Sequence, residues 1–101
     1  MPDWDRIVEE AERLAEDLRR REVDLAEVEK AVDFFVHTGC DEAVFARYLA
    51  IMAERPPLRS RKTRGYYQQL RGAWEGWGTP LRGLDKARAA GWAVRLAKVR
   101  G

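Results

Sequence analysis

The chain has 101 residues, of which 46% are apolar and 36% charged, and its formal net charge is +2. This length suits one domain with a single core, and the composition is that of a folded chain. The sequence contains no apolar run near the roughly 20 residues of a membrane span, no signal-peptide pattern and only one cysteine. We therefore predict a single cytoplasmic domain over residues 1–101, without a membrane partner and without an intrachain disulfide.

The first predicted helix runs from about Trp4 to Arg21, with Asp3 as its N-cap. Its carboxylates are expected to form a solvated face, with pairs four residues apart such as Glu9/Arg13, Glu16/Arg20 and Asp17/Arg21. Its apolar residues recur at helical spacing and should face the core. They are Trp4, Ile7, Val8, Ala11, Leu14, Ala15 and Leu18.

A capping box that begins at Asp24 predicts the start of a second helix, and Gly39 is expected to end it. A third helix is predicted from about Asp41 to Glu54, and the pair Pro56-Pro57 stops it. The apolar faces of these two helices should be buried. They consist of Leu25, Val28, Val32, Phe35 and Val36, followed by Val44, Phe45, Tyr48, Leu49 and Met52.

Ser60 is expected to cap a fourth helix over about residues 61–76. Thr79 is expected to cap a fifth, with Pro80 at its first helical position. The predicted apolar faces are Tyr66, Leu70, Ala73, Trp74 and Trp77 in the fourth helix, and Leu81, Ala89, Trp92, Leu96 and Val99 in the fifth.

No stretch of the sequence alternates as a strand would, so we predict an all-α fold, a compact bundle of about five helices. The residues expected at its centre are Ile7, Leu14, Leu18, Val28, Val32, Phe35, Phe45, Leu49, Leu70, Trp74 and Leu96.

Charge is divided unequally along the chain. Residues 1–54 hold 15 acidic and 7 basic residues, a net charge of −8, whereas residues 55–101 hold 2 acidic and 12 basic residues, a net charge of +10. A basic stretch of this kind is typical of phosphate binding, which suggests an anionic partner for the second half. The alternative is that the acidic half neutralises the basic half within one fold.

Catalytic and metal-binding motifs are not apparent. His37 and Cys40 are three residues apart, but a structural zinc site needs four such ligands and the sequence has one of each. The same pair lacks the orienting group and oxyanion site of a cysteine nucleophile. The glycines between Gly72 and Gly78 follow no predicted strand and precede no Gly-Lys-Ser/Thr, so they do not form a phosphate loop. We predict a non-enzymatic protein that holds neither metal nor cofactor.

Basic faces on the last two helices are the remaining candidates for function. Arg64, Gln68 and Arg71 should fall on one side of the fourth helix, where Tyr67 at the border could stack on a base. On the fifth helix a basic cluster is expected opposite Trp92. The complete set of predicted nucleic-acid-binding residues is Arg61, Lys62, Arg64, Tyr67, Gln68, Arg71, Arg88, Arg95 and Lys98.

The segment from Ser60 to Tyr67 (Ser-Arg-Lys-Thr-Arg-Gly-Tyr-Tyr) resembles the Thr/Ser-Ser-Gln-Ile-Arg-Lys-aromatic segment of the small helical subunit of type III-A CRISPR effector complexes. On that match Ser60 takes the capping position, Arg64 the arginine, and Tyr66 and Tyr67 the apolar pair. Arg61 and Lys62 replace Ser-Gln, and Thr63 replaces the usual aliphatic residue. The resemblance implies a small subunit that contacts RNA without cleaving it, beside other subunits of a ribonucleoprotein complex and copies of itself.

Two other classes remain open on the residues alone. The third and fourth helices with the proline elbow could mimic the helix-turn-helix of a DNA-binding regulator, although Gly65 and Gly72 make a poor recognition helix. The chain could also be a protein–protein adaptor without nucleic acid, whose acidic half or basic fifth helix docks an oppositely charged partner.

Overall fold

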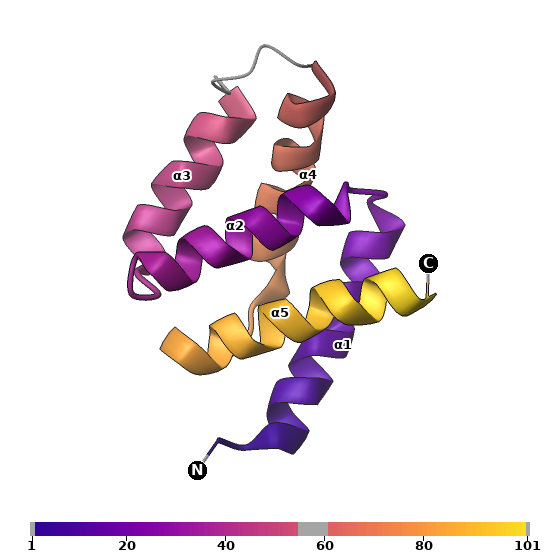
Figure 1. Cartoon of the computed structure of the whole chain (residues 1–101), viewed down its shortest axis with the longest axis vertical. Coiled ribbons are helices and arrows are strands. Elements are labelled where there is room, and N and C mark those ends of the chain that lie inside the picture. The colour runs from indigo at the N-terminus through magenta and orange to yellow at the C-terminus, as the bar shows by residue number, and fades with distance from the viewer. Residues whose placement is uncertain (1, 55–60, 101) are drawn as a thin grey trace.

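The computed structural model describes residues 2–54 and 61–100, and this part of the chain forms five α-helices and no strand (Figure 1). The predicted all-α fold class is therefore confirmed. The first four helices lie close to their predicted ranges. The helices are α1 (Trp4–Arg20), α2 (Leu25–His37), α3 (Glu42–Glu54), α4 (Arg61–Trp77) and α5 (Gly83–Arg100).

Aspartate side chains fix the starts of the first three helices. Asp3, Asp24 and Asp41 each accept a hydrogen bond from a backbone N–H in the first turn of α1, α2 and α3. These N–H groups have no partner within their helix, so each aspartate satisfies a donor that would otherwise need water. Gly39 follows the end of α2 with a φ of +74°, a conformation that favours glycine. The predicted cap of α4, Ser60, lies outside the described residues.

The predicted start of α5 is wrong, because the helix begins at Gly83 and not at Pro80. Thr79 is buried, and its hydroxyl accepts a hydrogen bond from the backbone N–H of Leu81 at 3.2 Å while also bonding to Glu10 of α1. Thr79 thus closes a turn against α1 instead of capping a helix. Gly83, with a φ of +60°, lets the chain enter α5 from that turn.

Two pairs of helices build the bundle. α5 packs mainly along α1 and also contacts α2, whereas α3 packs along α4. α4 in turn packs on α1, which joins the two pairs. The C-terminal end of α3 and the N-terminal end of α4 lie together at one end of the molecule, far from the N-terminus (Figure 1). The radius of gyration is 12.7 Å, close to the about 13 Å expected for a domain of this length.

All five helices contribute to one cluster of buried apolar residues. Every residue predicted at the centre is buried except Leu96, which is partly buried at its edge. Phe35, Phe45 and Trp74 form its aromatic part, with ring centroids 4.6–5.3 Å apart in tilted and edge-to-face arrangements.

Several residues predicted to face the core are instead on the surface, and α5 shows why. Its inward side is lined by alanines and Val94, which lets the helix approach α1 closely and leaves its bulky residues outside. The inward residues of α5 are Ala87, Ala89, Ala90, Ala93, Val94 and Ala97. The residues wrongly predicted as buried are Trp4, Val8, Val36, Val44, Trp92 and Val99.

Candidate nucleic-acid interface

The predicted binding residues fall on two separate surfaces. One group lies on α4 and the other on α5, and the backbones of these two helices do not approach each other in the part of the chain that the structure describes. The side chains of Arg61 and Lys62 lie outside that part. The placed members are Arg64, Tyr67, Gln68 and Arg71 on α4, and Arg88, Arg95 and Lys98 on α5.

At the N-terminal end of α4, Arg64 and Gln68 hold the end of α3. The Nε of Arg64 and the Nε2 of Gln68 each donate a hydrogen bond to the backbone carbonyl of Ala53 at 3.3 Å. This carbonyl lies in the last turn of α3, where it has no partner within the helix. Arg64 is nevertheless exposed, and among residues 2–54 and 61–100 no carboxylate pairs with it.

Arg71, two turns further along α4, has acidic neighbours. Its Nε lies 3.2 Å from an oxygen of Glu75, and its Nη1 lies 3.7 Å from an oxygen of Glu54. Both pairs are largely exposed, so each is weak and screened by salt. They still reduce the positive charge that Arg71 offers to a phosphate.

Tyr67 is buried, which contradicts the prediction that its ring stacks on a base. Its side chain is 1% exposed, and its hydroxyl donates to Glu27 of α2 at 3.1 Å and lies 3.1 Å from the hydroxyl of Tyr48. Burial, together with the nearby Tyr48 and Glu27, raises the pKa of Tyr67 far above its usual range. The sequence does contain the signal, since Tyr67, Leu70 and Trp74 are three and four residues apart and so share one helical face.

On α5, two of the three predicted cations are held by carboxylates. Lys98 lies 2.8 Å from Glu29 of α2, and its hydrogen bond lowers the pKa of that carboxyl. Arg88 pairs with Asp85 one turn earlier at 2.8 Å. Arg95 lies over the ring of Trp92, with 5.4 Å between the guanidinium carbon and the ring centroid. Trp92 is therefore on the same side of α5 as Arg95, and its predicted position opposite the basic cluster is wrong.

A further cation of α5, Lys86, is buried and does not belong to the predicted binding set. Its Nζ lies 2.7 Å from Glu42 of α3 and 4.5 Å from the centroid of the Trp74 ring. The indole Nε1 of Trp74 donates to the same carboxylate at 3.4 Å. One ion pair and one cation–π contact thus join α3, α4 and α5. The alternative that the acidic half neutralises the basic half is accurate for Lys86 and Lys98.

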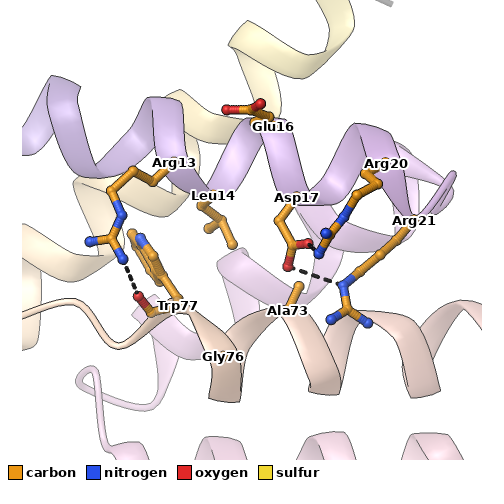
Figure 2. A pocket seen from close by; sticks show the side chains of 9 residues that line it. All are labelled: Arg13, Leu14, Glu16, Asp17, Arg20, Arg21, Ala73, Gly76 and Trp77. Atoms are coloured by element: carbon orange, nitrogen blue, oxygen red, sulfur yellow. Dashed lines mark hydrogen bonds and ion pairs between the residues drawn. The ribbon is translucent and has the colours of Figure 1, made fainter.

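The sequence also missed an arginine-lined groove of about 410 Å³ between α1 and α4 (Figure 2). At one end, Arg13 donates to both oxygens of Glu10 at 2.8–2.9 Å and to the backbone carbonyl of Trp77 at 2.9 Å. The indole of Trp77 donates to the carbonyl of Glu10 at 3.0 Å. Although burial alone would raise it, the pKa of Glu10 is lowered, because hydrogen bonds from Thr79 and Arg13 outweigh that penalty.

At the other end of the groove, Asp17 lies between Arg20 and Arg21, and both guanidinium groups donate to it (Figure 2). Burial again favours a higher pKa for Asp17, but these two bonds lower it below its usual value. Arg21 also donates to Gln69 of α4 at 2.9 Å, and its Nη1 would lie 2.7 Å from a Cβ built at Gly72. Glycine at position 72 therefore makes room for Arg21.

The groove is thus a contact that fastens α4 to α1, and its arginines already have acceptors inside the protein. Within residues 2–54 and 61–100, no three His, Cys, Asp or Glu side chains are grouped as metal ligands would be. In the same residues no helix combines the length and apolar character that crossing a membrane requires.

Comparison of the chain with protein-family models, curated proteins and solved structures finds no match in any of the three. Inference about function therefore rests on the chemistry of the surface.

Proposed function

We propose that this protein is a non-catalytic, nucleic-acid-binding subunit of a larger ribonucleoprotein assembly. Its contact with single-stranded RNA is made by the end of the molecule where α3 meets α4. The observation that carries the proposal is the state of Arg64, which is exposed and has no carboxylate partner among the described residues. An unpaired guanidinium can bind a phosphate bidentately without first breaking an ion pair.

The sequence around Arg64 adds charge of the same sign. Residues 55–74 contain no aspartate or glutamate, and six of them are basic. They are Arg55, Arg59, Arg61, Lys62, Arg64 and Arg71. The N-terminus of α4 lies within this stretch, and the partial positive charge of a helix N-terminus also favours an anion.

The ribonucleoprotein context rests on the resemblance of Ser60–Tyr67 to the small subunit of type III-A CRISPR effector complexes. The burial of Tyr67 agrees with its place in the apolar pair of that segment. Because an arginine that binds a backbone phosphate reads no base edge, we expect binding with little base preference. Other subunits of the complex, or further copies of this chain, would then share the strand.

The test is the salt dependence of single-stranded RNA binding by wild-type protein and by Arg64→Ala. We expect the variant to bind more weakly for all sequences. Its slope of log K against log salt should be shallower by about 0.7, because the variant neutralises one phosphate fewer. Arg71→Ala should have a smaller effect, because its charge is partly neutralised by Glu54 and Glu75. Fluorescence anisotropy over a range of salt concentrations measures both quantities.

Arg19→Ala is the matched control, since Arg19 is equally exposed but lies on α1 outside the basic stretch. Its affinity and slope should equal those of the wild type. Circular dichroism of Arg64→Ala should show the wild-type helix content, because the Ala53 carbonyl keeps its bond from Gln68. Equal slopes in Arg64→Ala and the wild type would refute the proposal and favour the adaptor alternative.

A further inference from the structure

One side of α5 carries five large side chains, four of which are exposed. These side chains follow one another at spacings of four, four, three and four residues, so they form a single stripe along the helix. They are Leu84, Arg88, Trp92, Arg95 and Val99. Leu84, Trp92 and Val99 are 52%, 42% and 84% exposed. Exposed apolar residues in a continuous row mark interaction sites more often than scattered ones do. We call these five residues the α5 stripe.

The N-terminus of α1 extends this surface with a second tryptophan. Trp4 is 49% exposed, and the guanidinium carbon of Arg88 lies 5.8 Å from the centroid of its ring. Arg95 lies over Trp92 at 5.4 Å. The surface therefore alternates tryptophan and arginine, two of the residue types most enriched where binding energy concentrates in protein interfaces. Ring contacts also hold both guanidinium groups in place before any partner arrives.

Gly91 gives the stripe a depression. It lies in the interior of α5, and a Cβ built there would meet no heavy atom within 4 Å, so packing within the chain does not require glycine. Glycine in a helix interior is less favourable than alanine. Together with Arg88, Trp92 and Arg95, Gly91 lines a depression of about 180 Å³. A small residue at this position lets a partner side chain approach the backbone of α5.

We propose that the α5 stripe docks an acidic amphipathic helix of a partner protein. Arg88 and Arg95 are seven residues apart, which is two turns or about 10 Å along the helix axis. A partner helix with carboxylates seven residues apart can therefore meet both arginines. Arg95 has no ion pair among the described residues. Arg88 donates one bond to Asp85, its side chain is 34% exposed, and its guanidinium group has further N–H donors. An apolar side chain between the two carboxylates would fill the depression beside Trp92.

Two features distinguish this surface from the proposed RNA contact. Exposed aliphatic side chains, Leu84 and Val99, belong to the stripe and suit a protein surface rather than a phosphate backbone. The stripe is also on α5, which contacts α4 through Lys86, a residue outside the stripe, so either proposal can fail alone.

The experiment titrates the full-length protein with a synthetic helical peptide and follows backbone and indole NMR signals. The peptide carries glutamates seven residues apart with leucines between them, and a second peptide has glutamine in place of both glutamates. We expect saturable shifts confined to α5 and the first turn of α1, and at least about tenfold weaker binding of the glutamine peptide. The variants Arg95→Gln and Trp92→Ala should each weaken binding of the glutamate peptide by a similar factor.

Gly91→Ala separates binding from folding. It should raise the thermal midpoint, because alanine favours the helix. It should nevertheless lower the affinity for the peptide, because the added methyl group fills the depression. Arg64→Ala should leave peptide binding unchanged. Shifts outside α5 and the first turn of α1, equal affinity for both peptides, or no saturation at millimolar peptide would overturn the proposal. A wild-type dimer in sedimentation that Trp92→Ala dissociates would also overturn the proposal, since a second copy would then occupy the stripe. Competition between RNA and the peptide would overturn it as well.

Discussion

The groove between α1 and α4 and the end where α3 meets α4 are both rich in arginine, but the arginines have different partners. In the groove, Arg13 and Arg21 donate to carboxylates of α1 and to acceptors on α4. At the α3–α4 end, Arg64 donates to a single backbone carbonyl and remains exposed. An arginine whose donors are used within the fold contributes to stability, and one with free donors can serve a ligand.

This difference explains why a count of charges overstates the binding surface. The basic half of the chain has a net charge of +10, but Lys86, Arg88 and Lys98 are each neutralised by a nearby carboxylate. Of the predicted binding residues that the structure places, the cations without an ion pair are Arg64 on α4 and Arg95 on α5. Variants of these two arginines test whether arginines without an ion pair bind a ligand. Measurements of folding stability test whether the contacts between α1 and α4 stabilise the fold.

The largest effect is expected at the floor of the groove. Leu14 is buried where α1 meets α4, so Leu14→Ala should lower the free energy of unfolding by about 2–5 kcal/mol. Val8, on the same helix but 41% exposed, is the control, and Val8→Ala should cost less than about 1 kcal/mol. Urea unfolding measures both. Similar losses at the two positions would mean that the groove does not fasten α4 to the bundle.

A smaller effect is expected from the buried hydroxyl on the inward side of α4. Tyr67→Phe removes its bond to the Glu27 carboxylate and should cost about 1–3 kcal/mol. Because the folded state raises the pKa of Tyr67, the unfolded state ionises first above pH 10.0, and wild-type stability should fall as the pH rises past that value. The fall should be shallower in Tyr67→Phe.

Tyr66→Phe provides the comparison for that experiment, since Tyr66 is the neighbouring ring and is only partly buried. Its alkaline profile should follow the wild type. Urea midpoints at pH 8 and above pH 10 are sufficient to distinguish the two variants. Identical profiles for Tyr67→Phe and the wild type would show that the buried phenol does not resist ionisation.

The smallest effect separates two glycines of α4. A Cβ added at Gly65 meets no heavy atom within 4 Å, so Gly65→Ala should stabilise the helix by about 0.5–1 kcal/mol. Gly72→Ala brings a methyl group against the Arg21 guanidinium, which is tied to Asp17 and Gln69. In Gly72→Ala this clash should therefore cancel or reverse the gain in helix stability that alanine gives. Thermal midpoints decide the matter, and equal gains at both positions would mean that Arg21 moves aside freely.

The five helices and most of the core can be predicted from local sequence patterns. Helix ranges follow from signals within a few residues, such as the Asp24 cap and the helical spacing of Ile7, Leu14 and Leu18, so they can be recognised without knowing the fold. The start of α5 was missed because Thr79 bonds to Glu10, a residue far away in the chain that no local pattern reveals.

Which basic residues lack an ion pair depends on how the helices pack. Lys98 meets Glu29, and Lys86 meets Glu42, because α2, α3 and α5 pack in one particular arrangement. The outward position of Trp92 likewise depends on α1 accepting the alanine side of α5. Ion pairing and burial join residues that are distant in sequence, and helical periodicity fixes the faces of a helix without fixing which face its neighbours cover.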